Sequence, residues 1–462
     1  MAKTRGGGSR QPELFARSKS PTIPIEPNHR LVLLTDQTDW TELEERVEAI
    51  RASKLKNAAG RPPRLRALMG ALLLKATRDM TWREAEDLIR HYAPARYLCG
   101  LTETDWSPDF TTLHDFATLL GEEGVRLINE YAVKWAVAEK LADPSVAVGD
   151  TTAQEAAIPY PNEMRLMAAF MTSVAAAGKR GGQALRGFVE KVEEKMQAAR
   201  EKVREYRLFA DTKAKKDRMT AQLATLVESV QVDLGRALKA ASPVGRLARY
   251  GKVARARVQQ LHETMKTLVP QIRYWLRTGF VAANKVISLQ MPEVYAVLRG
   301  KVGKPVEFGL TWGITRLRGG FLLATVAKQR RDLVDTKYAV TAVEQHIALF
   351  GKAPRAFAYD RGGHSVKNVQ RLQKLGVEEV GLAPRGRLPW AVDEKTRQML
   401  VRERALVEGG IGTVKSRRYG FNRPRARSTR MMGTYGQMAV LGFNLNKLVR
   451  ELARREGQEL VG

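Results

Sequence analysis

Three acidic residues stand where phosphodiester chemistry could use them: Asp150, Asp360 and Glu408. Asp150 lies in the run 146–158, where most of the other residues are apolar or small, Asp360 ends the short run 355–360 before Arg-Gly-Gly, and Glu408 belongs to a C-terminal helical stretch. Carboxylates can hold two Mg²⁺ ions about 3.5 to 4 Å apart, which stabilises the attacking and leaving oxygens of a phosphodiester. Taken singly, each acid has a plainer interpretation as a helix cap, a turn residue or an ion-pair partner.

Other mechanisms find little support in the sequence. It contains no G-x-x-x-x-G-K-[ST], H-E-x-x-H or G-x-S-x-G motif, and its six histidines are scattered. No nucleotide cofactor is therefore expected. A tyrosine recombinase would need an H-x-x-R motif, which does not occur. Because Cys99 is the only cysteine, neither an intrachain disulfide nor a thiolate metal cluster can form, which indicates a reducing, intracellular setting.

The charge balance points to a polyanionic partner. The 462 residues include 78 Lys+Arg and 49 Asp+Glu, a formal net charge of +29. Nucleic acid is the leading candidate, although ribosomal and membrane-surface proteins can be equally basic. The longest nearly apolar run, 166–178, is shorter than the ~18 residues of a membrane span, and residues 1–30 lack an apolar signal core, so no membrane is expected.

A basic segment near the C-terminus concentrates this charge. Residues 415–430 contain no acid, and Tyr419 and Phe421 lie between the cations. We expect this segment to follow a DNA backbone and to stack an aromatic ring on a base; the alternative is a solvated basic tail. Its cations are Lys415, Arg417, Arg418, Arg423, Arg425, Arg427 and Arg430.

The order of the elements predicts a mixed α/β protein. Residues 1–38 have the composition of a flexible basic arm, and 39–143 form a helical N-terminal DNA-binding domain with a capping box at Thr81–Glu84. A strand at 146–158 precedes a long helical insertion, 162–299. Two strands in 303–327, separated by Gly319-Gly320, are followed by helix, strand 355–360, helix, strand, helix 394–414 and a C-terminal helix in 431–462.

The insertion carries apolar residues at coiled-coil spacing: Leu185, Phe188, Val192, Met196, Ala199, Val203 and Tyr206. This seam predicts either a dimer interface or an intramolecular helical hairpin. Residues 163–299 hold 26 basic and 12 acidic side chains, which fits a DNA-binding arm or a solvated helix face.

Three segments that contain the acids resemble the catalytic blocks of bacterial insertion-sequence DDE transposases. They are VGDTTAQEAAIPYPNE (148–163), FAYDRGGHSVKN (357–368) and VRERALVEGGIGTVKSRRYGFNRPRARS (401–428). The third block of that family has Tyr, Arg, Glu and Lys at fixed spacing; Arg404, Glu408 and Lys415 match it, and Val401 replaces the Tyr. SPDFTTLHDF (107–116) resembles the family's helical N-terminal domain.

The resemblance implies a ribonuclease-H-like mixed sheet flanked by helices, built from residues 144–161 and 300–430, with the helical insertion after its first strand. It implies that Asp150, Asp360 and Glu408 are catalytic and bind two Mg²⁺, with Mn²⁺ as a substitute. DNA contacts would come from Arg404, Lys415, Arg417, Arg418, Arg423, Arg425 and Arg427. Such an enzyme cuts DNA at transposon ends and joins the 3′-OH to target DNA.

The implied partners are the terminal inverted repeats and target DNA, together with further copies of the chain, in a homodimer or higher oligomer. The implied location is the bacterial cytoplasm, at the nucleoid. A ribonuclease-H-like nuclease without strand transfer, or a domesticated DNA-binding protein without catalysis, remain alternatives.

Glu403 competes with Glu408 for the third acidic position. The two lie about 140° apart around a helix, so both cannot face one site, and the spacing to Arg404 and Lys415 favours Glu408. Glu155 and His364 are close in sequence to the proposed ligands, and we expect them to support the ligands or the fold.

Overall fold

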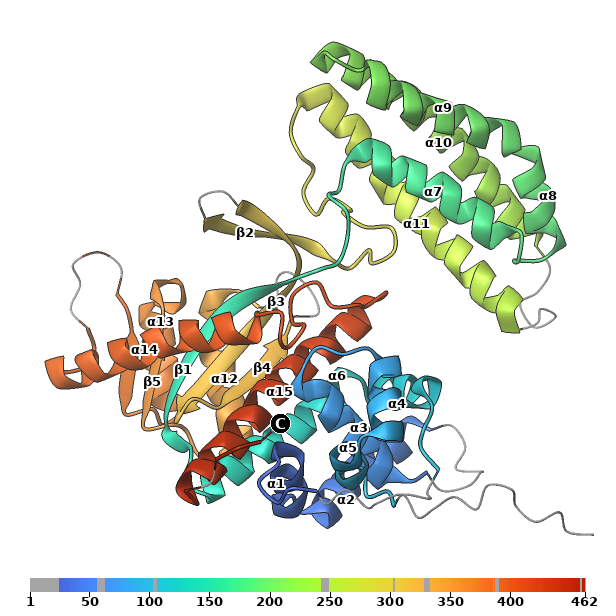
Figure 1. Cartoon of the computed structure of the whole chain (residues 1–462). Coiled ribbons are helices and arrows are strands. Elements are labelled where there is room, and N and C mark those ends of the chain that lie inside the picture. Colours follow the sequence, from blue (N-terminus) through green and yellow to red (C-terminus); the bar gives the residue numbers. More distant parts are fainter. Residues whose placement is uncertain are drawn as a thin grey trace, which may run out of the picture.

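A six-stranded mixed sheet lies at the centre of the computed structural model (Figure 1). The structure describes residues 25–55, 63–102, 106–241, 249–301, 304–327, 333–384, 386, 390–457 and 459–461. At residues 299–301 and 304–305 only the backbone is described. The strand order is β2-β3-β1-β5-β6, and β4 also pairs with β3. β5 runs parallel to β1 and to β6, whereas β3 is antiparallel to β1, β2 and β4. The prediction of a mixed α/β fold is confirmed. The strands are β1 (Asp143–Glu155), β2 (Tyr295–Lys301), β3 (Lys304–Arg318), β4 (Leu322–Val326), β5 (Ala356–Tyr359) and β6 (Glu379–Leu382).

The predicted hairpin in 303–327 forms as β3 and β4. Its turn uses Gly319 and Gly320, which have φ of +97° and +93°, a conformation that glycine adopts without steric cost. β2 was not predicted from the sequence; its residues fall at the end of the predicted helical insertion and the start of the predicted core. β2 pairs with the first half of β3 and widens the sheet at its edge.

Helices cover both faces of the sheet. α12 (Asp335–Phe350) and α13 (Val366–Lys374) pack on one face, where Tyr338 and Phe357 are buried. α14 (Glu394–Val414) packs on the other face through Leu400, Val407 and Ile411. The bounds of α14 are those predicted.

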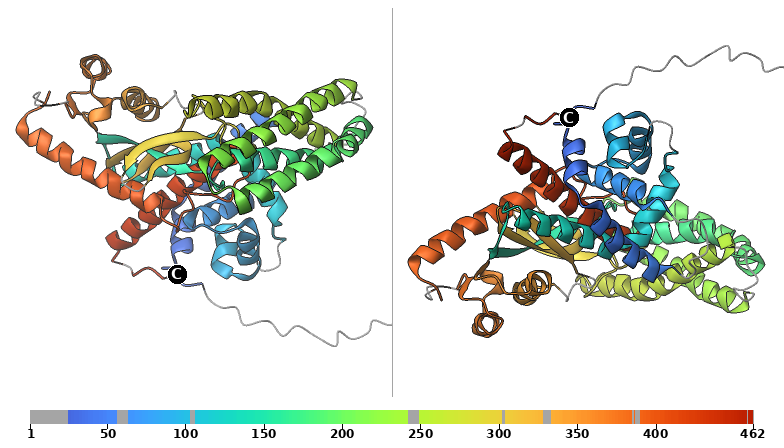
Figure 2. Two further views of the ribbon diagram at one scale, coloured as in Figure 1. Left: turned by 90° about the horizontal axis from the view of Figure 1, so that it is seen from above. Right: turned by 90° about the horizontal axis from the view of Figure 1, so that it is seen from below.

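The N-terminal helices form one buried cluster with the last helix of the chain, α15 (Thr429–Arg455). α15 is buried almost all round, because it passes between these helices and the sheet (Figures 1 and 2). The predicted capping box is present: Thr81 accepts from the backbone N–H of Glu84, and the Glu84 side chain accepts from that of Thr81. These helices are α1 (Arg30–Gln37), α2 (Trp40–Lys54), α3 (Leu65–Thr77), α4 (Trp82–His91), α5 (Ala93–Leu98) and α6 (Phe110–Ala138).

The prediction of a flexible N-terminal arm is wrong for residues 30–37, which form α1. The His29 side chain caps the N-terminus of α1. Four of the first five residues of α1 are Leu or Val, and these apolar side chains are buried against the N-terminal cluster. Residue 461 pairs with 29, so the described ends of the chain lie side by side. Residues 1–24 lie outside the described part.

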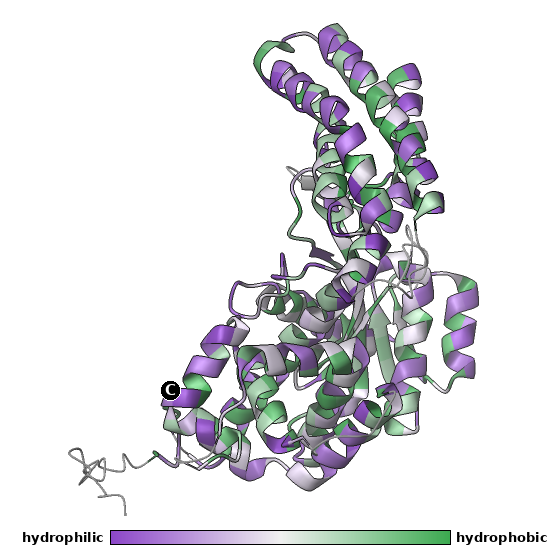
Figure 3. Ribbon diagram, turned by 90° about the vertical axis from the view of Figure 1, so that its right-hand side faces the viewer, coloured by the Kyte–Doolittle hydropathy of each residue, from purple (hydrophilic) through white to green (hydrophobic). Residues whose placement is uncertain are grey.

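The insertion folds as a bundle of helices with its own buried cluster, which projects from the sheet (Figures 1 and 3). The seam from Leu185 to Ala199 is buried in this bundle against α7, α10 and α11. The intramolecular alternative is therefore the one observed, and these side chains are not free to form a dimer interface. The helices are α7 (Glu163–Gly178), α8 (Gln183–Lys191), α9 (Glu193–Phe209), α10 (Lys213–Ala240) and α11 (Arg249–Thr278).

Candidate active site at the carboxyl ends of β1 and β5

Asp150 and Asp360 come from neighbouring parallel strands. In the β1–β5 ladder Val148 pairs with Ala358, so continuing the register two residues brings Asp150 beside Asp360. Side chains alternate along a strand, so Asp150 lies on the α14 side of the sheet with Val146 and Val148. Both aspartates are partly exposed. The strand register thus brings two of the three predicted acids to one edge.

Asp360 also caps the 3₁₀ turn Arg361–Gly363. One of its carboxylate oxygens, Oδ1, accepts the backbone N–H of Gly362 at 2.8 Å. The capping interpretation and the site interpretation are compatible, because this bond occupies only one of the two carboxylate oxygens.

A third acid, Asp335, approaches the same edge from the opposite face of the sheet. It is the first residue of α12, and its Oδ1 accepts the hydroxyls of Thr151 at 2.7 Å and of Tyr359 at 3.1 Å. An added methyl at Gly362 would collide with its carboxylate, so Asp335 lies against the turn that follows Asp360. Asp335 was not predicted from the sequence, because an acid in the first turn of a helix is common for electrostatic reasons alone.

The tyrosine beside these acids stays protonated. The pKa of Tyr359 is raised, first by burial and then by the charges of Asp335 and Asp150. Burial and the charge of Asp150 also raise the pKa of Tyr338, whose hydroxyl bonds to Thr315 at 2.8 Å. The Tyr359 hydroxyl therefore remains a donor that fixes the Asp335 carboxylate.

Glu403 and Glu408 have different environments on α14. Glu403 is held against the sheet by an ion pair with Arg316 and a second one with Arg318 at 3.3 Å. Glu408 is exposed and lies about 140° away around the helix. Of these two glutamates, Glu408 is therefore accessible to a ligand, whereas Glu403 forms ion pairs that stabilise the packing of α14 on the sheet.

Lys415 and Arg404 lie on the side of α14 that carries Glu408. The Lys415 ammonium is 3.3 Å from the hydroxyl of Thr152, which is two residues from Asp150 and on the same face of β1. Since Lys415 follows Glu408 by seven residues, or about two turns, the two side chains project from a similar side of α14. Arg404 is half-buried, one turn before Glu408.

The carboxylates do not yet form a complete metal site. Among the described residues, no three His, Cys, Asp or Glu side chains lie close enough together to hold a metal ion. Asp150 and Asp360 offer the hard oxygen ligands that Mg²⁺ prefers, so the donors fit in kind. Glu408 does not converge with them in this structure.

The basic segment, residues 415–430, differs from its prediction in one respect. Its arginines are exposed, but Tyr419 and Phe421 are buried in the core, where Phe421 packs edge-on against Trp312 and Tyr419 against Phe443. These two rings anchor the segment and cannot stack on a base. The sequence pattern could not separate the two roles, because an aromatic among arginines suits either.

Two residues near the site support this segment and the turn after β5. Glu155, at the end of β1, accepts the backbone N–H of Arg423 through its carbonyl at 2.8 Å, and its carboxylate lies 3.4 Å from the guanidinium. Arg423 has φ of +52°, which this double contact stabilises. His364 ends the 3₁₀ turn after Asp360 and is partly exposed.

Comparison with known proteins gives one match. Residues 21–119 match the family model described as Transposase domain (DUF772), which spans α1 to α5 and the start of α6. No curated protein and no solved structure matches the chain. The match supports a transposase role, with DNA as the partner that such a role implies. In the described part of the chain, no helix combines the length and the apolar character needed to cross a bilayer.

Proposed function

We propose that this chain is a DDE transposase in which Asp150, Asp360 and Glu408 carry the chemistry on DNA. The observation that carries the proposal is the parallel pairing of β1 and β5, which brings Asp150 and Asp360 together at one sheet edge. α14 packs on the same face of the sheet, where Lys415 contacts Thr152 of β1, and Glu408 projects from the side of the helix that carries Lys415. The family match at residues 21–119 independently supports a transposase role.

The topology supports a ribonuclease-H-like core. In that fold the first strand carries one Asp, the fourth ends at the second, and the last acid comes from a helix packed against the sheet. If β2 is set aside as an added edge strand, β1 is the first strand and β5 the fourth. The helical bundle then enters after the first strand.

The acids would hold divalent metal, with Mg²⁺ first and Mn²⁺ as the substitute. Asp150 and Asp360 would bind from the strand ends, and Glu408 would complete the set when α14 or its side chain moves toward them. Bound there, two metal ions would supply the positive charge that polarises a scissile phosphodiester.

The remaining roles belong to the cations. The Lys415 ammonium can hold a phosphate next to Asp150, and Arg404 can hold another one turn earlier on α14. The exposed arginines of the basic segment would bind the flanking backbone. We expect the substrates to be transposon ends and target DNA, bound by two or more copies of the chain at the bacterial nucleoid, with the dimer contacts outside the buried seam of the bundle.

The test is Mg²⁺-dependent processing of a plasmid that carries the DNA flanking the gene. Wild type should nick the flanks and join the exposed 3′-OH to target DNA, and Asp360→Ala should do neither. Glu378→Gln is the matched control, because Glu378 is an exposed acid at the opposite end of β6, beside the start of β5.

The outcomes separate the candidate functions. Nicks without joined products would favour a nuclease over a transposase. Binding without cleavage by the wild type would favour a non-catalytic DNA-binding protein. Equal activity of Asp360→Ala and wild type would remove Asp360 from the site.

A further inference from the structure

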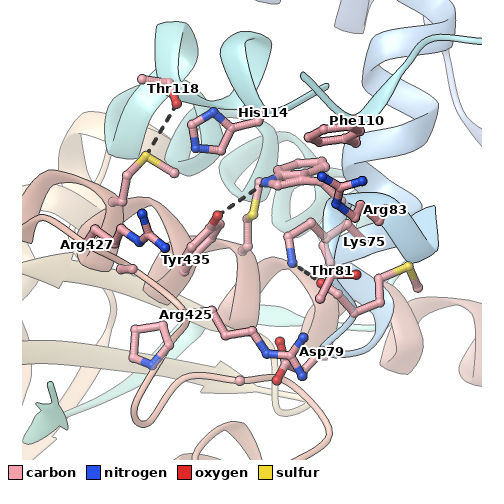
Figure 4. Close-up of a pocket in the computed structure, with 18 of the residues that line it drawn as sticks. Lys75, Asp79, Thr81, Arg83, Phe110, His114, Thr118, Arg425, Arg427 and Tyr435 are labelled. Atoms are coloured by element: carbon pink, nitrogen blue, oxygen red, sulfur yellow. Dashed lines mark hydrogen bonds between the residues drawn. The ribbon is translucent and has the colours of Figure 1, made fainter. Parts of the chain in front are cut away.

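A cavity of about 840 Å³ lies between the N-terminal helices and the chain that follows α14 (Figure 4). One wall comes from the end of α3, the start of α4 and the first turns of α6; the other comes from residues 419–438. Ligand pockets in proteins typically measure about 300 to 1,000 Å³, so the cavity is large enough for a nucleotide. Neither the acids at the sheet edge nor Lys415 lines it.

Aromatic rings form much of the wall. The indole N–H of Trp82 donates to the Tyr435 hydroxyl at 3.2 Å, which joins α4 to α15 across the cavity. Phe110 lines the α6 side, and the Arg83 guanidinium lies 3.9 Å from the centre of its ring. Flat apolar surfaces of this kind suit the face of a nucleobase.

The floor of the cavity is positively charged. The Lys75 side chain is buried, its ammonium donates to the Met80 carbonyl, and it lies 5.2 Å and 5.1 Å from the centres of the Trp82 and Tyr435 rings. Asp79 is exposed at the same turn of the chain. Positive charge beneath the rings favours an electron-rich or anionic ligand.

Two exposed arginines lie at the opening of the cavity. Arg425 and Arg427 belong to the basic segment, line the cavity and are exposed. In the described part of the chain neither forms an ion pair. Guanidinium groups bind phosphate oxygens in bidentate fashion, so these two can hold a phosphate at the entrance.

We propose that the cavity takes one unpaired nucleotide of the bound DNA, with its base on the aromatic wall and its phosphate on Arg425 and Arg427. An intact duplex presents charged phosphates outward and keeps its bases stacked, so it would not fill an apolar recess. Tyr419, in the cavity wall, is four residues after Lys415, so one segment serves both the cavity and the sheet edge. The inference rests on the proposed function for its DNA partner.

The experiment compares two duplexes of the flanking DNA. One is fully paired, and the other carries a single unpaired 2-aminopurine, whose fluorescence falls when it stacks on a ring. Full-length wild type should bind the second duplex about 5- to 150-fold more tightly, the range that one stacked base contributes, and should quench its fluorescence. Phe110→Leu and Arg425→Gln should lose most of this preference. Arg425→Gln should keep the thermal unfolding temperature of wild type, because Arg425 is exposed, whereas Phe110→Leu also loosens packing against the N-terminal helices.

Arg417→Gln is the control, because Arg417 is an exposed arginine of the same segment outside the cavity. It should weaken binding of both duplexes equally and keep the preference. Equal binding of the two duplexes by wild type would overturn the proposal, as would a preference that survives in both cavity variants. If wild type nicks and joins flanking DNA but shows no preference, the cavity assignment fails and the proposed function stands. If it binds neither duplex, both fail.

Discussion

At the scale of single residues, the two glutamates of α14 are a natural test of the site. They share a helix, but Glu403 is tied to arginines of β3 whereas Glu408 is exposed on the side that carries Lys415. The two carboxylates should therefore affect different properties of the protein.

Under the proposed function, Glu408→Gln should reduce cleavage and joining by at least about 100-fold, because losing a proposed metal ligand should cost no less than losing a residue that supports one. Its free energy of unfolding should stay within about 0.5 kcal/mol of wild type, since the side chain is exposed. Glu403→Gln should have the opposite effects. It leaves Arg316 without its charge partner, so the free energy of unfolding should fall by about 1 to 3 kcal/mol. Cleavage and joining should stay at the wild-type level at temperatures where the variant is folded. Chemical denaturation and the plasmid assay measure both effects. If Glu403→Gln lost activity and Glu408→Gln lost stability instead, Glu403 would be the third acid.

The lowered pKa of buried Lys75 should make the stability of the protein depend on pH. Burial lowers its pKa to about 8 in the folded chain from 10.5, so between those values the unfolded state binds more protons and stability rises with pH. The gain should begin near pH 8, be complete near pH 10.5 and amount to roughly 3 kcal/mol. Lys75→Met should lack this rise, which denaturation curves of both proteins across this pH range would measure. Parallel pH profiles for the two proteins would contradict the assignment to Lys75.

Some site residues could be predicted from sequence and others could not. Asp150 and Asp360 stand out because each is an acid in or just after a strand of apolar or small residues. Asp335 does not stand out, since its partners Thr151 and Tyr359 are distant in sequence. Phe421 lies among arginines in sequence but packs against Trp312, more than 100 residues away.

At the scale of elements, the close contact between α15 and α3 depends on a single glycine. This helix packs against α3 so closely that a methyl group added at Gly442 would overlap the Ala76 carbonyl. The glycine therefore permits the close contact between α15 and α3, one of the N-terminal helices.

Gly442→Ala should destabilise the protein even though alanine favours a helix by about 1 kcal/mol, because α15 and α3 would have to separate. We expect a net loss of about 1 to 3 kcal/mol. Gly187→Ala in α8 is the matched control, since an added methyl there meets nothing within 4 Å and should stabilise by about 0.5 to 1 kcal/mol. Thermal unfolding distinguishes the two, and a neutral Gly442→Ala would show that the interface can repack.

The elements themselves were largely predictable. The capping box predicted the start of α4, and periodicity predicted α14, because these signals are local. The short strand β2 was missed, since a strand at the sheet edge depends on its partner β3 for most of its stability. The bundle seam was ambiguous, because the same apolar spacing serves contacts within a chain and between chains.

At the scale of the whole molecule, the excess of 29 positive charges should dominate DNA binding. The exposed arginines of the basic segment are the clearest candidates for binding phosphate, while the bundle adds further basic side chains. The logarithm of the binding constant should therefore fall linearly with the logarithm of salt concentration.

Replacing Arg417, Arg425 and Arg427 together by Gln should reduce the magnitude of this slope by about 0.9 for each phosphate that the variant no longer neutralises. Fluorescence anisotropy with a duplex of the flanking DNA, titrated at several salt concentrations, measures the slope. Replacing three exposed cations of the bundle, Lys191, Arg200 and Arg204, tests whether the bundle binds the same DNA. An unchanged slope in the first variant would show that the basic segment does not contact phosphate.

The sequence alone determined the charge, the class of fold, the helical character of most regions, and the acids in or after the strands, because these follow from composition and from patterns shorter than one element. The tertiary structure decided that Asp335 joins the sheet edge, that Glu403 serves the fold, and that the seam is internal. It also decided that a cavity forms between α4, α6 and α15. Each of these depends on contacts between residues far apart in the chain, and their pairing is set by which surfaces pack together when the whole chain folds.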